Sequence, residues 1–490
     1  MSVDDDPGLP IKFGPCSNGE YVPAPLTAVE RSAIRLGYEA CAANARALGM
    51  SRREFMFTAS AAATMLLVLQ GCGGGLKKPE PGGRYVVPSE AGRDMAAAGH
   101  ALSGEEFIFD VQGHHLEYDL MRSRPQERFF GSVFPQVNCG RDDPHACFAR
   151  EVFMEEFFLH SDTSMVTLSA LPIAPKGSPL SAAIMDETRR TAELACGWES
   201  VLLHAQVLPN YGSLQDNLDG MEENARRYPI KAWKVFTHFP DAFGDPGNAW
   251  RLDDRDPQLP RVGHAFIEKA RELGIKTICA HKGFGAGSRY ASPEDVPAAA
   301  RDFPDVNFVV YHSGFESTGP AEGPYLWATA RRGINRLIAA MKRHGVSPNE
   351  NVYAELGSTW WTIMRDPTQA AHVLGKLLKY VGENNVLWGT DSIFYGSPQD
   401  QIQTFRSFSI TPAFQERYGY PALTKERKAK ILGLNGARVY GITPRSDRCE
   451  FTRRELEAIR RELGRRHATH GPRNAAEVKA LREHHRGWPG

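Results

Sequence analysis

The chain lacks the features that mark several common classes of protein. Its 490 residues carry 58 basic and 58 acidic side chains, so the formal net charge is zero and predicts neither nucleic acid nor an acidic membrane surface as a partner. Eight cysteines, none in a CxxC pair, are too few for a disulfide scaffold and do not predict a zinc ribbon. Cys139 and Cys147 are close enough in sequence to form a disulfide, but only in an exported protein.

Long apolar runs and two catalytic motifs are also absent. The apolar segment 58–69 is too short to predict a stable membrane span. The glycine-rich stretch 282–287 lacks the spacing and the Lys-Ser/Thr ending of a phosphate-binding loop. No serine lies in a nucleophile elbow, which argues against a serine hydrolase. With 42% hydrophobic and 24% charged residues, the chain has the composition of a globular protein with a sizeable core.

A segment that resembles an export signal lies inside the N-terminal region. Arg52 and Arg53 precede the apolar segment 58–69, an order that resembles a twin-arginine signal. Cys72 follows in a setting like a lipobox, although Gln70 stands where a small residue is usual. The alternative is an ordinary alanine-rich helix after two surface arginines. We therefore expect either a periplasmic or otherwise exported protein, or a cytoplasmic one.

Strand-like runs alternate with helical patterns over most of the remaining chain, and their number predicts the fold. Apolar residues at helical spacing, as in 334–341 and 370–381, separate short buried runs. Eight such units predict an α/β TIM (β/α)8 barrel, with an open doubly wound sheet as the alternative. We divide the chain into an N-terminal extension (1–50), a signal-like segment and linker (51–83), the barrel (105–442) and a helical C-terminal tail (443–490). The predicted strands are Phe107–Gln112, Val166–Pro172, Val201–Pro209, Ala232–His238, Thr277–Gly283, Asn307–Glu316, Val352–Ser358 and Val386–Ser392.

Metal-type ligands stand where four of these runs end. The first run leads into Asp110, Gln112 and His114, and the fifth ends on His281. The sixth ends on His312 and the eighth on Asp391. Because the carboxyl ends of barrel strands meet at one rim, we expect these side chains to converge around a divalent metal ion.

These motifs together resemble the amidohydrolase superfamily, and most closely its amidohydrolase-related branch, which also contains nonoxidative decarboxylases. The sequence 430–441 is similar to the closing helix of that branch, so the resemblance covers about 105–442. It implies one divalent ion, expected to be zinc, bound by His114, His281 and Asp391. It further implies that Asp391 moves the proton, while His312 polarises the substrate carbonyl or holds the water.

Gln112 departs from the family pattern, which normally has histidine at this place. An amide oxygen is a poorer zinc ligand than imidazole. Three outcomes stay open: weak ligation by Gln112, which we expect first; a bulge that turns the neighbouring His115 inward; and loss of the metal. Lys234 on the fourth predicted strand occupies the place of a carboxylated lysine in binuclear relatives, but an interior salt bridge is the favoured interpretation.

Other residues are candidates for contacts with a substrate. An inward-facing Glu355 would need a partner, for which Lys234 is available. Trp360 and Trp361 follow the seventh predicted strand and are suited to stacking on a ring, or to plain packing. The long connections 121–165 and 240–262 are candidate lids over the active face, and the second contains Trp250 and Arg251.

The resulting hypothesis is a metal-dependent hydrolase, in which metal-activated water attacks an amide, lactone or similar carbonyl of a small-molecule substrate. One alternative is a nonoxidative decarboxylase of an aromatic or enoic acid that uses the same site. Another is an exported binding protein that has lost the metal. Barrels of this type often pair, so a homodimer stands among the expected assemblies.

Overall fold

The computed structural model describes residues 8–445 except 15, 22, 74–80, 123–143, 175–176, 240–248, 285–287, 318–321 and 331. Eight parallel strands form one sheet in chain order, so that each strand pairs with the next one along the chain. All eight predicted strands are present. They are β2 (Phe109–Gly113), β3 (Met165–Ser169), β4 (Val201–Gln206), β5 (Ile230–Phe236), β6 (Thr277–His281), β7 (Asn307–Tyr311), β8 (Val352–Glu355) and β9 (Val386–Leu387).

Hydrogen bonds between the first and last strand regions close the sheet into a barrel. The backbone N–H of Val111 donates to the carbonyl of Trp388 at 3.0 Å, and that of Asp391 donates to Gln112 at 2.9 Å. A parallel bridge between Gly113 and Ser392 continues the contact. The predicted TIM barrel is therefore confirmed, and the open doubly wound sheet is wrong.

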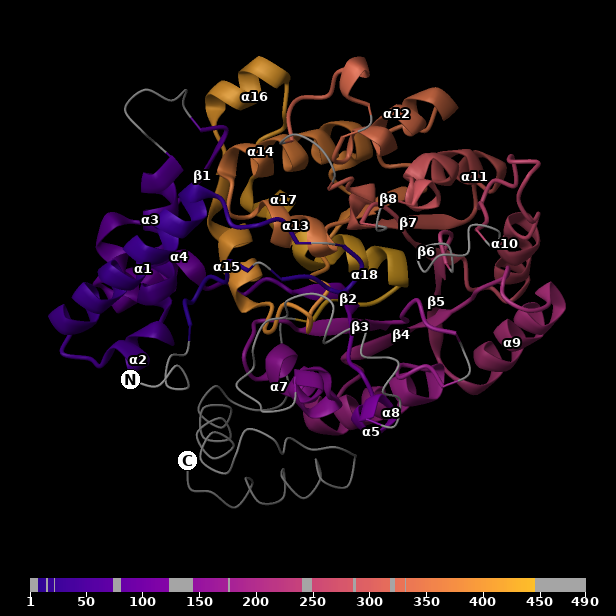
Figure 1. Ribbon diagram of the computed structural model, residues 1–490, viewed down its shortest axis with the longest axis horizontal. Coiled ribbons are helices and arrows are strands. Elements are labelled where there is room, and N and C mark those ends of the chain that lie inside the picture. Colours follow the sequence, from indigo (N-terminus) through magenta and orange to yellow (C-terminus); the bar gives the residue numbers. More distant parts are fainter. Residues whose placement is uncertain are drawn as a thin grey trace.

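Helices surround the barrel, as the sequence pattern predicts (Figure 1). In α12, the buried residues Leu337, Ile338 and Met341 recur at helical spacing and turn one apolar face inward. The surrounding helices are α5 (Tyr118–Arg122), α7 (Arg150–Phe158), α8 (Ala182–Cys196), α9 (Leu214–Arg227), α10 (Gly263–Glu272), α11 (Val296–Asp302), α12 (Asn335–His344), α13 (Gly357–Ile363), α14 (Pro367–Lys376), α15 (Gln399–Ser407), α16 (Pro412–Tyr418), α17 (Lys425–Ala429) and α18 (Asn435–Tyr440).

An apolar cluster fills the amino-terminal half of the barrel. It combines inward side chains of the strands with Ala437 and Tyr440 of α18. Phe109 is fully buried there, with its ring 5.5 Å from that of Tyr440. This end of the barrel is a packed core, so a ligand site is expected at the opposite end.

The N-terminal region forms helices that pack beside the barrel. These are α1 (Ala28–Ala47), α2 (Arg52–Met56), α3 (Ala59–Gly73) and α4 (Met95–Leu102), and α15 packs against α3 and α4 (Figure 1). The segment that resembles an export signal is α2 and α3, in which Ala61, Met65 and Leu66 are buried. Export stays a prediction. Within the described ranges, no helix combines the length and the apolar character needed to cross a membrane.

The short strand β1 (Gly83–Tyr85) pairs antiparallel with β10 (Phe408–Ile410) and joins the N-terminal region to the end of α15.

Cys147 and Cys196 are each disulfide-bonded. Cys139, the partner that the sequence suggested for Cys147, lies outside the described residues. So do most of the predicted linker and of the helical tail, and much of the first part of both candidate lids.

Candidate metal centre

The carboxyl end of the barrel brings His114 and Asp391 into direct contact. His114 Nε2 lies 3.0 Å from Asp391 Oδ1, and both side chains are buried. His114 Nδ1 donates to the backbone carbonyl of Ser169 at 2.7 Å, because a carbonyl oxygen can only accept. The Nε2 lone pair then faces a carboxylate oxygen unless a proton or a metal ion lies between them. This is the orientation in which proteins hold a metal-binding histidine.

Gln112 lies beside this pair and presents its amide nitrogen to it. Nε2 donates to Asp391 Oδ1 at 3.0 Å and lies 3.5 Å from His114 Nε2. The buried Oε1 atom has no hydrogen-bond partner among the described residues. A half turn of the amide would exchange the two atoms and direct Oε1 toward His114 and Asp391. Weak ligation by Gln112 stays a prediction, for which the side chain is suitably placed.

His281 and His312 form the second part of the centre, with ring centroids 4.7 Å apart. His281 Nε2 donates to the carbonyl of Phe284 at 3.3 Å, which leaves the lone pair on Nδ1. His312 Nδ1 accepts from the backbone N–H of Ser358 at 3.3 Å, so its proton is on Nε2. Neither His281 Nδ1 nor His312 Nε2 has a hydrogen-bond partner within the described part of the chain.

A carboxylate that sequence reasoning missed, Glu20, lies against these two histidines. Its Oε2 atom is 3.3 Å from His281 Nδ1 and 3.7 Å from His312 Nε2. One ligand atom from each of the three residues lies within 4.8 Å of the others, close enough for one metal ion. The neighbouring Asn18 Nδ2 donates to Glu20 Oε2 at 2.6 Å and to Asp391 Oδ2 at 2.7 Å. One amide nitrogen therefore links the two groups of donors.

The donor set fits a divalent cation. Imidazole and carboxylate groups are the ligands that zinc and similar ions prefer. Buried polar atoms are normally paired, so a His281 Nδ1 without a hydrogen-bond partner beside the Glu20 carboxylate marks a place suited to a cation or a shared proton. We call His114, His281, His312, Asp391 and Glu20 the candidate metal centre.

Burial and hydrogen bonds set the charges of these groups. Burial acts to raise the pKa of Asp391, but hydrogen bonds from His114 and Ser358 outweigh it and lower the pKa, so the carboxylate is charged at neutral pH. Burial lowers the pKa of His312 to about 3, which keeps its ring neutral. Burial and the adjacent Asp391 charge raise the pKa of Glu20. A bound cation would favour the charged form of Glu20.

The backbone is strained where it presents two of these side chains. His312, Ser313 and Asp391 have φ values of 56°, 53° and 58°, in the left-handed region that non-glycine residues seldom adopt. Such residues cost on the order of 1–3 kcal/mol each and cluster at functional sites. The sixth and eighth predicted strands, Asn307–Glu316 and Val386–Ser392, extend too far, because β7 ends at Tyr311 and β9 ends at Leu387 before the chain turns to present His312 and Asp391.

Glu355 lies at the same end of the barrel, fully buried as the strand alternation predicts. Its Oε2 accepts from the backbone N–H of His312 at 2.9 Å, while Oε1 has no hydrogen-bond partner among the described residues. Burial raises the pKa of Glu355 well above its ordinary value, so this carboxyl group is neutral. It positions the His312 turn. A contact between Glu355 and a substrate stays a prediction.

Two expectations for residues near the site are corrected. Lys234 forms no ion pair with any described acidic group, Glu355 included; its Nζ instead lies 3.3 Å from the centroid of the Tyr311 ring. His115 does not turn inward, because its Nε2 lies 2.9 Å from Thr188 Oγ1 on α8. A bulge that brings His115 to the metal is therefore wrong, although the β2–β3 register does shift between Asp110 and Gly113.

The aromatic and arginine residues expected to touch a substrate make internal contacts. Trp250 Nε1 donates to the carbonyl of Phe236 at 3.2 Å, and Arg251 pairs with both oxygens of Asp253. Trp360 Nε1 donates to the carbonyl of Gln401, and Trp361 stacks on Tyr395 with centroids 4.6 Å apart. All three tryptophans are buried. None of these contacts places them among the metal-type donors, and their binding of a substrate stays a prediction.

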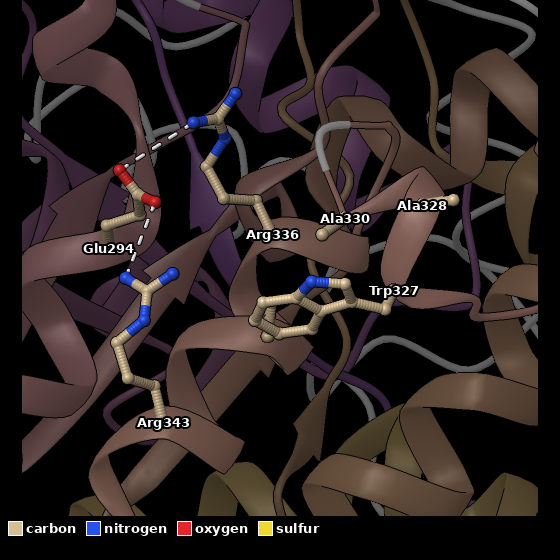
Figure 2. A pocket seen from close by; sticks show the side chains of 7 residues that line it. Glu294, Trp327, Ala328, Ala330, Arg336 and Arg343 are labelled. Carbon is tan, nitrogen blue, oxygen red and sulfur yellow. Dashed lines mark ion pairs between the residues drawn. The ribbon is translucent and has the colours of Figure 1, made fainter.

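A separate hollow of about 290 Å³ lies beside α12, and none of the metal-type donors lines it (Figure 2). Glu294 forms ion pairs there with Arg336 at 3.6 Å and with Arg343 at 3.7 Å. Trp327 lines the hollow and is 69% exposed. The Glu294 carboxylate is thus neutralised by two arginines, and the described lining contains no second acid or histidine that could bind a metal.

The eight-stranded parallel barrel, with imidazoles and carboxylates gathered at the carboxyl ends of its strands, defines a TIM-barrel protein with a metal-type donor centre on its functional face. Residues 192–442 match the family model described as amidohydrolase, which is about half of the chain. The chain belongs to the amidohydrolase family, and this confirms the resemblance inferred from its motifs. No curated protein matches the chain.

Several solved structures are similar to this chain at low sequence identity. An uncharacterised TIM-barrel protein from Bordetella bronchiseptica is 14% identical, with 68% of this chain and 98% of that chain covered and a TM-score of 0.44. 4-Oxalomesaconate hydratase from Rhodopseudomonas palustris is 18% identical, with coverage of 73% and 99% and a TM-score of 0.41. 5-Carboxyvanillate decarboxylase from Sphingomonas paucimobilis is 13% identical, with coverage of 69% and 99% and a TM-score of 0.40.

Proposed function

We propose that this protein is a metal-dependent hydrolase of a small molecule with an amide, lactone or similar carbonyl group. The observation that carries the proposal is the 3.0 Å contact between His114 Nε2 and Asp391 Oδ1, with the other His114 nitrogen committed to Ser169. The His114 Nε2 lone pair and a carboxylate oxygen at this distance need a proton or a cation between them. His281 Nδ1 is also buried without a hydrogen-bond partner among the described residues.

His114, His281 and Asp391 would hold one divalent ion, expected to be zinc. A bound divalent ion supplies a Lewis acid that polarises a carbonyl and lowers the pKa of water toward about 7. His312 carries its proton on Nε2, directed into the centre, and its ring is neutral. It is thus suited to donate a hydrogen bond to a carbonyl oxygen on which negative charge develops.

Asp391 is suited to accept the proton that the attacking water loses. Its carboxylate is charged, and Ser358 Oγ donates to Oδ2 at 2.5 Å, which orients the group. Asn18 and Gln112 donate to the same carboxylate and complete its surroundings. A group held in this way is pre-oriented for proton transfer within hydrogen-bond reach of a substrate.

The test begins with elemental analysis of the purified, tag-free protein without added metal or chelator. We expect about one divalent ion per chain. The metal-loaded protein is then assayed on amides, lactones and carboxylated aromatics, with carbon dioxide release measured beside hydrolysis. Products of hydrolysis are expected. Release of carbon dioxide without water addition would assign a decarboxylase instead, and no metal after reconstitution would favour the binding-protein alternative.

Asp391→Asn is the matched variant because it keeps the size of the side chain and removes its charge. We expect turnover to fall at least about 100-fold, within the range for loss of a general base, while the melting temperature of the metal-free protein changes little. A variant that retains most of its activity would remove Asp391 from the mechanism.

A further inference from the structure

We propose that Glu20, which belongs to the N-terminal segment outside the barrel, is a ligand of the metal ion. It supplies the ligand that is lacking because Gln112 stands where the family normally has histidine. The inference rests on the proposed function, because it concerns the same divalent ion. It assigns part of the centre to a segment that precedes the first barrel strand by about 90 residues of sequence.

The contact between Glu20 and His281 has the geometry of two ligands that share an ion. Glu20 Oε2 lies 3.3 Å from His281 Nδ1, the nitrogen that carries the lone pair because Nε2 donates to Phe284. Two ligand atoms at about 2.0–2.2 Å from one tetrahedral ion lie roughly 3.3–3.5 Å apart. Two electron-rich atoms at this separation require a cation or a shared proton.

Hydrogen bonds from neighbouring residues hold Glu20 in position. Asn18 Nδ2 bridges its carboxylate to Asp391, and the backbone N–H of Glu20 donates to Asn18 Oδ1 at 2.9 Å. The next residue, Tyr21, contacts the barrel through its hydroxyl group, 2.9 Å from that of Tyr395. Lys12 anchors the start of the segment through Asp400, with Nζ 2.8 Å from Oδ1. The carboxylate is therefore held between fixed points on both sides.

The charge of the donor set gives the reason for this arrangement. Gln112 supplies at most a neutral amide oxygen, which binds zinc poorly. Glu20 adds a second carboxylate to Asp391, so that two negative charges would balance one divalent cation in a buried site. Removal of residues 1–72, as signal processing would cause, would remove Glu20. The metal-binding form of this protein therefore retains its N-terminal segment.

The experiment measures zinc affinity in the full-length protein, without any assay of activity. Wild type, Glu20→Gln and the control Glu39→Gln are stripped of metal and titrated with Zn²⁺ against a chromophoric chelator. Glu39 is 60% exposed on α1 and pairs only with Arg35 among the described residues, so its substitution removes a carboxylate that contacts none of the metal-type donors. Melting of the metal-free variants checks that each one folds.

We expect Glu20→Gln to raise the zinc dissociation constant at least about 100-fold, which exceeds the usual 10- to 100-fold effect of losing an outer partner of a ligand. Glu39→Gln should leave the constant unchanged. A second variant provides the rescue: adding Gln112→His to Glu20→Gln restores an imidazole to the barrel, and we expect it to recover at least about 10-fold of the lost affinity.

Zinc binding by Glu20→Gln as tight as that of wild type would overturn the inference and leave the proposed function intact. That result, together with faster turnover in the variant, would identify the segment as a plug over the site and Glu20–His281 as a proton-sharing pair. Equal losses in the Glu20 and Glu39 variants would also overturn it. Absence of zinc binding by the wild type would instead refute the proposed function.

Discussion

The two ends of the barrel differ in whether their buried polar atoms have hydrogen-bond partners. At the amino-terminal end, Phe109 packs against Tyr440, and the buried Cys279 Sγ and Tyr440 OH lie 3.5 Å apart. At the carboxyl-terminal end, His281 Nδ1, His312 Nε2 and Glu355 Oε1 are buried without partners among the described residues. The positive φ angles of His312 and Asp391 lie at this end as well.

This difference shows how one fold separates stability from function. Burial of a closed apolar cluster stabilises the fold, and removal of each buried methylene group lowers the free energy of unfolding. Unpaired donors and strained turns cost free energy in the absence of a ligand, and proteins tolerate them where the surrounding structure enforces them. We therefore expect substitutions at the amino-terminal end to change the free energy of unfolding, and those at the carboxyl-terminal end to change binding and turnover.

The largest change in stability should follow Phe109→Ala. This side chain is fully buried, and its removal leaves a cavity between β2 and α18. We expect the free energy of unfolding to fall by about 3–5 kcal/mol. Chemical denaturation measures the loss, and a zinc titration of the folded variant should give the affinity of wild type. A large loss of zinc affinity with little loss of stability would contradict the separation of the two ends.

Two glycine-to-alanine variants compare the ends directly. In Gly433→Ala the new methyl group would lie 2.1 Å from the backbone carbonyl oxygen of Phe107, so backbone must move; we expect a loss of about 1–3 kcal/mol in stability. In Gly389→Ala it would lie 1.9 Å from Glu355 Oε1, a side-chain atom that can shift. Because Glu355 positions His312, we expect turnover to fall on the order of 10- to 100-fold, with a smaller loss of stability. Denaturation and turnover are measured for both variants. A Gly433→Ala variant that mainly loses turnover, with a Gly389→Ala variant that mainly loses stability, would contradict the difference between the two ends.

The smallest effect concerns His204, which lies in the layer between the two ends. Its ring stacks on Tyr440, and Nδ1 lies 2.9 Å from Tyr311 OH. Burial and the nearby Lys234 charge hold the pKa of His204 well below its ordinary value. The folded state therefore keeps this ring neutral, while the unfolded chain binds a proton below a pH of about 6.5. Stability is lost as the pH falls through that value.

His204→Gln should make this pH dependence shallower, by at most about 1.4 kcal/mol per pH unit, the value for one proton. Denaturation at a series of pH values between about 5 and 8 measures the slope. The exposed His100→Gln on α4 is the control and should leave the slope at the wild-type value. An unchanged slope in His204→Gln would show that the ring titrates alike in the folded and unfolded states.

Much of the barrel could be predicted from the sequence because each unit is encoded locally. Every strand is a short apolar run, and the helices between them repeat apolar residues at helical spacing, so periodicity alone gives eight strand–helix units. The strand ends were less well predicted. The turn at His312 and the early end of β9 depend on how the chain leaves the ladder to present a side chain, which residue type does not encode.

The centre was predictable only in part, for a similar reason. His114, His281, His312 and Asp391 follow barrel strands, so the closed topology brings them together. Glu20 and Asn18 belong to no strand and to no motif, and a lone acid in a polar segment gives no signal of a ligand. Lys234 and the tryptophans have residue types suited to a site, but their partners are decided by packing.

The sequence by itself determined the fold, the family and the residues that end the barrel strands, because these depend on periodicity and on the rule that parallel strands end at one rim. Only the tertiary structure decided which nitrogen of each histidine is free, where His115 and Lys234 point, and that Glu20 meets His281 and His312. Those facts depend on contacts between residues hundreds of positions apart in the chain, and such contacts exist only once the barrel has closed and the N-terminal segment has packed against it.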